Sequence, residues 1–142
     1  MTGLIALLAA VALTAVVAAA VKAKNGRFSG ASPRPDTEML TRADIGTALG
    51  ERATLVQFSS AFCAPCRATR VLLTDVAAKV DGVVAVDIDA EEHLDMVRRL
   101  NIMRTPTVLV LDASGAVTTR ASGLPRREQV LAALGEAVQD AR

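Results

Sequence analysis

Two cysteines three positions apart, Cys63 and Cys66, constrain this chain more than any other feature. They stand between a predicted apolar strand, residues 55–60, and a segment with helical spacing, residues 68–80. A cysteine at a helix N-terminus meets unpaired backbone N–H groups and the positive end of the helix dipole, which favour the reactive thiolate. The second thiol then lies one turn further on, within reach of a small disulfide ring. Pro65 suits a first helical turn, where a missing N–H costs little.

A Cys-x-x-Cys pair also occurs in zinc sites and in static disulfides. A structural zinc site needs four ligands, whereas these are the only two cysteines, and the single histidine, His93, lies in a charged run predicted to be a solvated helix. A site completed by carboxylates stays open as the minor alternative. A static disulfide that closes so short a loop gains little stability. The spacing therefore favours redox chemistry, with no metal and no cofactor other than the cysteine pair.

Composition bounds the function further. The 142-residue chain carries 16 basic and 15 acidic side chains, a net charge of +1, so nothing indicates a nucleic-acid partner. It has no Trp or Tyr and three Phe, so platforms for stacking bases or ring ligands are scarce. The length suits one domain of about 100–120 residues plus an appendage. Nothing in the sequence demands more than a monomer.

The appendage is predicted at the N-terminus, where residues 3–21 form a continuous run of apolar and small side chains. At about 1.5 Å per residue, a helix of this length just crosses a hydrocarbon core of about 30 Å. Residues 1–23 are therefore predicted to be a single-pass membrane anchor. The alternatives are a cleaved signal peptide, with residues 18–20 as an Ala-x-Ala cleavage site, and a buried core helix.

Flanking charge sets the expected orientation in the membrane. The basic residues beside the span, Lys22, Lys24 and Arg27, all follow it. The positive-inside rule then places the soluble domain on the cytoplasmic side of the cell membrane. An extracytoplasmic domain, or a protein secreted after signal cleavage, is the alternative. Residues 24–38, rich in Gly, Ser, Pro and charge, are predicted to be a flexible linker that is either solvated or in contact with anionic headgroups.

Residues 39–142 are predicted to be one globular domain in which helical and strand periodicities alternate. A strand–helix–strand connection predicts a parallel pair with a right-handed crossover, and a final hairpin adds an antiparallel edge. The predicted fold class is α/β, with a mixed sheet of four or five strands and helices on both faces. The buried stripe expected on the cysteine helix is Val71, Leu72, Val76 and Val80. The expected elements are residues 41–49, 53–59, 68–80, 83–89, 91–100, 107–111, 116–121 and 125–138.

From residue 40 to residue 137 the chain resembles a thioredoxin-family domain. The landmarks that carry this resemblance are the Cys63-Ala64-Pro65-Cys66 motif, the acidic-ended strand 86–89, Thr105-Pro106-Thr107, and the glycines Gly115 and Gly123 around the last strand. The resemblance implies a thioredoxin-like fold and thiol–disulfide exchange. Cys63 is implied to attack a substrate disulfide as the nucleophile, and Cys66 to resolve the mixed disulfide.

The resemblance also implies roles for residues near the pair. Pro106 is implied to be a cis-proline against the two thiols, with Thr105 pairing its main chain with a substrate strand. A plain trans strand opener is the alternative for Pro106. Phe62 stands where the family usually has Trp, and we expect it to contact substrate. Ala64 and Pro65 are implied to tune the stability of the thiolate.

Gln57 is the main departure from the family pattern. Many thioredoxins carry a buried Asp there that helps deprotonate the resolving thiol, and a paired Lys where this chain has Ala85. The two losses go together, because a buried charge without its partner is costly. Gln57 hydrogen-bonds but takes no proton, so we expect a slower resolving step and a narrower role than that of a general reductase. Met103 and Arg104 are expected on the substrate-facing rim by family analogy.

The resulting hypothesis is a membrane-tethered thiol–disulfide oxidoreductase that reduces protein disulfides through Cys63 and Cys66. Its expected partners are disulfide-containing proteins, an electron-donating reductase, and the membrane through residues 3–21. The alternative of a different class is a non-catalytic redox switch or partner-binding module. A copper(I) carrier that uses the same two cysteines is a more distant alternative.

Overall fold

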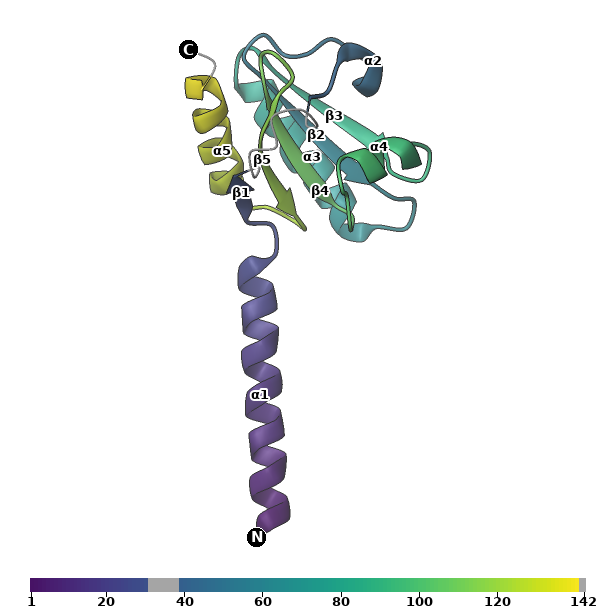
Figure 1. Cartoon of the computed structure of the whole chain (residues 1–142). Helices are drawn as coiled ribbons and strands as arrows, with labels where there is room; N and C mark the ends of the chain where they lie inside the picture. The colour runs from purple at the N-terminus through teal and green to yellow at the C-terminus, as the bar shows by residue number, and fades with distance from the viewer. Residues whose placement is uncertain (31–38, 141–142) are drawn as a thin grey trace.

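The computed structural model describes residues 1–30 and 39–140. A long helix projects from an α/β domain built around one sheet (Figure 1). The described elements are α1 (Thr2–Lys24), β1 (Phe28–Gly30), α2 (Arg42–Ile45), β2 (Ala53–Ser59), α3 (Ala64–Lys79), β3 (Val83–Asp89), α4 (Leu94–Arg99), β4 (Thr107–Asp112), β5 (Val117–Ser122) and α5 (Arg127–Asp140).

The sheet has five strands in the order β1-β5-β4-β2-β3. Strands β2 and β3 are parallel, and the other three neighbouring pairs are antiparallel. This confirms the predicted mixed sheet, the parallel pair joined through the cysteine helix, and the antiparallel hairpin of β4 and β5. The crossover α3 therefore begins at the carboxyl end of β2, which brings the cysteine pair to one end of the sheet.

Two apolar clusters fill the space on the two faces of the sheet. Because side chains alternate along a strand, Leu55 of β2 faces α3 and α5, whereas Val56 and Phe58 face α2 and α4. All seven residues of β2 are buried, which makes this strand the centre of the domain. Helices thus cover both faces, as the sequence predicts.

Strand β1 lies inside the stretch that the sequence assigns to a flexible linker. It pairs antiparallel with β5, with Phe28 opposite Ala121, and the hydroxyl of Thr119 donates to the carbonyl of Ser29 across 2.8 Å. β1, not the hairpin, therefore forms this edge of the described sheet. The short segment has no strand pattern of its own, and it is ordered because β5 offers unpaired backbone groups. Of the predicted linker, residues 31–38 lie outside the described residues.

The cysteine helix starts earlier than its apolar spacing indicates. Helix α3 begins at Ala64, and its buried side chains are Cys66, Thr69, Leu73 and Val76. Val71, expected in the buried stripe, is exposed. The stripe runs at intervals of three and four residues from Cys66, because that thiol packs inward and sets the helix phase.

Two other helices are shorter than predicted. Helix α2 ends at Gly46, which adopts the left-handed conformation with φ of 73°, and not at Gly50. Helix α4 begins at Leu94, not at residue 91; Leu94 is exposed, and Met96 is the buried residue of this helix. Beyond the end of α2, Leu49 still packs against the core from a loop, which extends the apolar periodicity past the helix. Helix α4 is shorter mainly at its start, where residues 91–93 are exposed and polar.

Candidate active site

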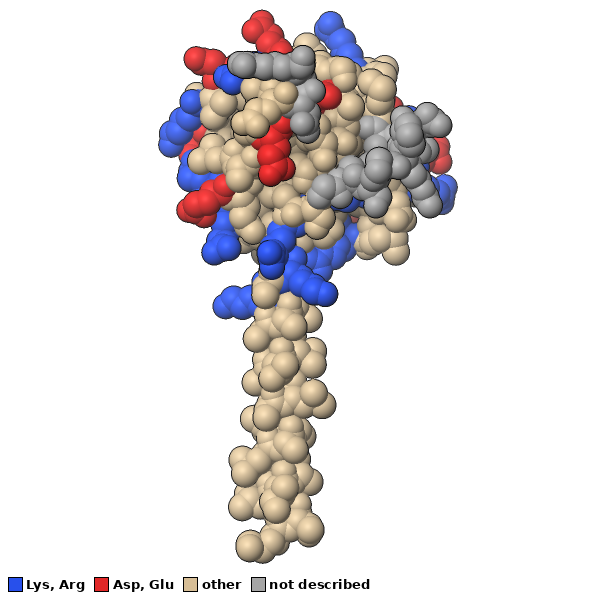
Figure 2. All heavy atoms as spheres, turned by 60° about the vertical axis from the view of Figure 1, so that its left-hand side comes forward, with Lys and Arg blue, Asp and Glu red and all other residues tan. Residues whose placement is uncertain are grey.

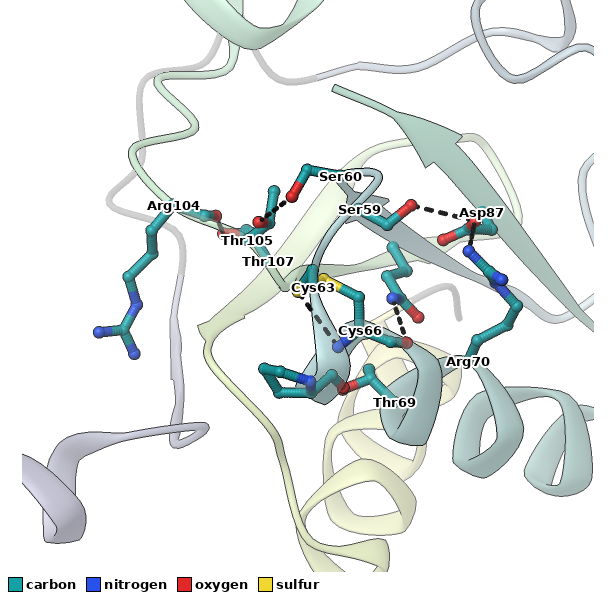
Figure 3. Close-up of a disulfide and its surroundings, with 12 residues drawn as sticks. Ser59, Ser60, Cys63, Cys66, Thr69, Arg70, Asp87, Arg104, Thr105 and Thr107 are labelled. Atoms are coloured by element: carbon teal, nitrogen blue, oxygen red, sulfur yellow. Dashed lines mark hydrogen bonds and ion pairs between the residues drawn. A yellow bond between two sulfur atoms is a disulfide. The ribbon is translucent and has the colours of Figure 1, made fainter. Parts of the chain in front are cut away.

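Cys63 and Cys66 form a disulfide at the first turn of α3, with their Cα atoms 5.2 Å apart. Cys63 is the N-cap residue of the helix, and the backbone N–H of Cys66 lies 3.2 Å from the Cys63 sulfur (Figure 3). Cys66 is 1% exposed, whereas Cys63 is partly exposed. The more accessible sulfur is thus the one that faces the donor groups of a helix N-terminus, where a thiolate is favoured.

A second loop lies beside the disulfide, where β4 begins. The peptide bond between Thr105 and Pro106 is cis, as the family resemblance implies, and Pro106 is buried. The hydroxyls of Ser60 and Thr105 are 3.0 Å apart and form a hydrogen bond between the two loops (Figure 3). The Thr107 hydroxyl donates to the carbonyl of Arg104 across 2.6 Å. These bonds position the cis-proline loop against the loop that carries Cys63.

Gln57 lies behind the pair and is almost fully buried. Its side-chain Nε2 donates to the carbonyl of Cys66 across 2.8 Å, whereas its Oε1 has no hydrogen-bond partner among the described residues. The alternation along β2 that sends Leu55 toward α3 sends Gln57 the same way. Ala85 lies on β3 opposite Leu55 and packs at the edge of the same apolar cluster. The side chain of β2 that bonds the backbone of the buried cysteine is therefore a neutral amide.

An ion pair beside the site was not among the residues singled out from the sequence. Asp87 of β3 accepts a hydrogen bond from Ser59 at 3.1 Å and pairs with Arg70 of α3 at 2.5 Å (Figure 3). It links the carboxyl end of β2 with the side of the cysteine helix. The available signal was the acidic end of the second predicted strand, residues 83–89, which served only as a landmark of the family resemblance. Arg67, the residue that follows Cys66, is exposed.

The rim of the site carries exposed apolar side chains. Phe62, next to Cys63, is fully exposed, and Met103 on the other loop is 83% exposed. Arg104 differs from its expected place on this rim, because its guanidinium turns away from the disulfide toward the end of α1 (Figure 3). There it bonds Asn25 and the carbonyl of Ser122. One backbone carbonyl and one side-chain amide oxygen thus hold a side chain that the family analogy had placed on the substrate-facing rim.

The described residues hold no cluster of three or more His, Cys, Asp or Glu side chains that could bind a metal ion. His93 stands at the N-cap of α4, with its Nδ1 3.0 Å from the carbonyl of Asp89. The histidine therefore contacts a loop on the α4 side of the sheet and does not approach the cysteine pair.

Together, the mixed sheet, the disulfide at a helix N-terminus and the neighbouring cis-proline define a thioredoxin-like fold with a cysteine pair at its usual place. The comparisons with known proteins agree. The family model described as Thioredoxin matches residues 37–136. The chain belongs to the thioredoxin family.

Characterised relatives are similar over this domain. The thioredoxin of Alicyclobacillus acidocaldarius is 31% identical over 105 residues, which cover 72% of this chain and 99% of that protein. The human thioredoxin domain-containing protein 2 is 35% identical over 72 residues, and the match covers 49% of this chain but only 13% of that longer protein. The family in general acts on disulfide-containing protein substrates.

Solved structures support the fold alone, because their sequence identities are low. Thioredoxin-2 of the malaria parasite, described as a component of its protein secretion machinery, superimposes with a TM-score of 0.55 at 12% identity and covers 60% of this chain and 82% of that one. Deadhead, the germline-specific thioredoxin of Drosophila melanogaster, gives a TM-score of 0.54 at 16% identity, with coverage of 61% and 81%.

Proposed function

We propose that this protein is a membrane-tethered thiol–disulfide oxidoreductase that reduces protein disulfides with Cys63 and Cys66. The observation that carries the proposal is the asymmetry of the pair: Cys63 is accessible at the helix N-terminus, and Cys66 is 1% exposed. An exposed thiolate reaches a protein substrate, and a buried neighbour acts only once a mixed disulfide has formed beside it.

The reaction follows from this arrangement. The Cys63 thiolate attacks one sulfur of a substrate disulfide, a new S–S bond joins Cys63 to the substrate, and the other substrate sulfur leaves and takes a proton. Cys66 then loses its proton and attacks the Cys63 sulfur, which releases the second substrate thiol and leaves the domain oxidised. The substrate gains two electrons and two protons, and an electron-donating reductase returns the same number to the domain. The cysteine pair is the only redox group that this cycle needs.

The surrounding residues would assist this cycle in different ways. Thr105 and Pro106, held by the Ser60 hydroxyl, line the place where a substrate strand would lie beside the pair. Exposed Phe62 offers an apolar contact next to Cys63. Ala64 and Pro65 occupy the first turn of α3 between the cysteines, where they influence how well the helix N-terminus stabilises the thiolate.

The membrane tether rests on α1. This helix has 23 residues, is apolar enough to cross a bilayer, and has no buried residue, although an N-terminal signal sequence passes the same test. Lys22 and Lys24 in its last turn favour a domain on the cytoplasmic side. Sidedness is tested by reducing intact cells with a permeant thiol, washing them, and adding an impermeant maleimide. Labelling of Cys63 only after lysis supports a cytoplasmic domain, and labelling in intact cells refutes it.

Activity is tested with the full chain in detergent, a model protein disulfide and excess dithiol reductant. We expect many turnovers for the native chain, none for Cys63→Ser, and a trapped mixed disulfide for Cys66→Ser. A non-catalytic redox switch is the competing function, and it is favoured by Gln57, which takes no proton from Cys66. A switch would not raise the rate of substrate reduction above that of the dithiol reductant alone, which is the result that would overturn the enzymatic proposal.

A further inference from the structure

The disulfide and the exit of the N-terminal helix lie at the same end of the sheet. Phe28 at the start of β1 is opposite Ala121 near the end of β5, which is opposite Val108 near the start of β4. Val108 is in turn opposite Gln57 near the end of β2. The segment that follows α1 and the loop that carries the cysteines therefore lie at the same end of the sheet. This is the end to which the arrowhead of β5 points, above α1 (Figure 1).

Hydrogen bonds join the end of α1 to the cis-proline loop. The backbone N–H of Gly26 donates to the carbonyl of Ser122 across 2.7 Å, and the next residue, Gly123, donates to the carbonyl of Pro106, also across 2.7 Å. The guanidinium of Arg104 donates to the same Ser122 carbonyl at 2.8 Å and to the side-chain oxygen of Asn25. The first residue after α1 is thus connected to the cis-proline loop through one strand end.

Close backbone contacts make this junction specific. Gly26 and Gly123 both have positive φ angles, 72° and 96°. A Cβ at Gly26 would overlap the carbonyl of Leu124, and a Cβ at Gly123 would overlap the side-chain oxygen of Asn25. Only glycine accepts both the backbone conformation and the approach. The junction between α1 and the domain is therefore closely packed. We call it the joint, and it consists of Asn25, Gly26, Arg104, Ser122 and Gly123.

Basic side chains surround the joint. They gather where α1 meets the domain (Figure 2). Two hollows flank the end of the helix, and the described residues that line them include six basic and no acidic side chains. These basic residues are Lys22, Lys24, Arg27, Arg104, Arg120 and Arg126. Their charge and their place at the end of an apolar helix match the anionic headgroups of a bilayer surface.

We propose that this joint holds the disulfide end of the domain against the membrane surface, so that the substrates are disulfides of membrane-anchored proteins held close to the headgroups. At the usual strand spacing, β2, which leads to the cysteine pair, lies about 14 Å across the sheet from β1, which follows α1. Phe62 and Met103, both exposed, lie in the loops at this end of the sheet. The inference rests on the proposed function for its redox step and on insertion of α1 for its geometry.

The orientation is tested without any enzymatic readout. The full chain with Cys63→Ser and Cys66→Ser is given one new cysteine, labelled with a fluorophore, and placed in vesicles that contain an anionic phospholipid and a lipid with a nitroxide on its headgroup. Met103→Cys reports the disulfide end, and Ser114→Cys, in the exposed turn between β4 and β5, reports the opposite end. We expect quenching at least threefold stronger at position 103. Equal quenching, or stronger quenching at position 114, would overturn the proposal.

Variants of the joint show whether it sets the orientation. Arg104→Ala removes the bonds to Asn25 and Ser122 and should reduce the difference in quenching. Arg98→Ala removes an exposed arginine of α4 and is the matched control, with no change expected. A ten-residue Gly/Ser insertion between Asn25 and Gly26 should abolish the difference. If the difference survives the insertion, the joint is not its cause and the proposal fails.

The substrate preference is tested in the same vesicles with one disulfide-bonded peptide, either free in solution or attached to a lipid by a short linker. At the same total amount of peptide in the sample, we expect the native chain to reduce the lipid-attached form at least tenfold faster than the free form. The chain with the insertion should lose this preference. Equal rates for the native chain would overturn this inference while leaving the proposed function intact. Failure to reduce either peptide would instead refute the proposed function.

Discussion

The side-chain Nε2 of Gln57 donates to the carbonyl of Cys66 across 2.8 Å, in a position where Gln57 is 1% exposed. This bond fixes the first turn of α3 from behind and places an uncharged group next to the buried cysteine. The other amide atom, Oε1, has no partner among the described residues. The Gln57 amide thus holds the first turn of α3 through Nε2 alone. Substitutions at residue 57 can therefore test what this one bond contributes.

Replacing Gln57 by Glu keeps the shape but makes the group titratable. Only the protonated acid can donate to the Cys66 carbonyl, and burial disfavours the carboxylate, so we expect a raised pKa for the new carboxyl. In the unfolded chain the new carboxyl ionises near pH 4.3, whereas in the folded chain it keeps its proton to a higher pH. The free energy of unfolding therefore falls as pH rises above about 4.3. We expect a loss of about 1–3 kcal/mol at pH 8 and little loss at pH 4, measured by urea unfolding in detergent.

The control for this variant is Gln57→Leu, which has similar volume and no titratable group. It removes the bond to Cys66 at every pH, so its loss of stability should be the same at pH 4 and pH 8. A Gln57→Glu protein with an equally flat pH profile would show that residue 57 does not sense the buried carbonyl.

The bond between the Ser60 and Thr105 hydroxyls connects the cysteine loop to the cis-proline loop. We expect Ser60→Ala and Thr105→Val to be coupled in a double-mutant cycle by about 0.5–1.5 kcal/mol, because either change alone already breaks the bond. The measurement is the free energy of unfolding of the two single variants and the double variant. Additive effects would mean that the two loops are positioned independently.

Phe62 contributes nothing to the core, because its side chain is fully exposed. Phe62→Ala should therefore change the free energy of unfolding by less than about 0.5 kcal/mol. If Phe62 is buried by a protein substrate, kcat/KM for that substrate should fall about tenfold, while the rate with a small-molecule disulfide stays the same. Val71→Ala, an exposed apolar residue further along α3, is the matched control and should leave both rates unchanged.

A capping box stabilises the start of α2 and gives the domain a pH dependence. The backbone N–H of Thr41 donates to the carboxylate of Asp44 across 2.7 Å, and this bond, with the nearby Arg99 guanidinium, lowers the pKa of Asp44. The stabilisation is present above the ordinary aspartate pKa and is lost as pH falls through the lowered value. Asp44→Asn should cost about 0.5–2 kcal/mol at pH 7 and much less at pH 2, measured by urea unfolding. An equal loss at both values would rule out the carboxylate as the cause.

The sequence was sufficient to predict those features that depend only on residues close together in the chain. The apolar run of β2, the positions of Cys63 and Cys66 around a helix start, and the hairpin of β4 and β5 all follow from short-range spacing, and the structure has them as predicted. Helix phase was less predictable. Val71 looked buried by periodicity, but the inward packing of Cys66 turned it to solvent.

Long-range partners account for what the sequence did not reveal. Strand β1 has three residues and no alternating pattern, and it exists because the open edge of β5 pairs with it. Arg104 was expected beside substrate, yet acceptors contributed by Asn25 and Ser122, far from it in the chain, draw it to the helix junction. The Asp87 ion pair with Arg70 likewise joins two elements whose distance no local pattern encodes.

The sequence by itself determined the family, the position of the cysteine pair, the mixed sheet and an apolar N-terminal helix, because each depends on residue type and spacing along the chain. Only the tertiary structure decided which end of the sheet that helix joins and how Asn25 and Gly26 meet the cis-proline loop. Strand register and backbone contacts between distant segments set those relationships, and such contacts form only when the whole sheet has assembled.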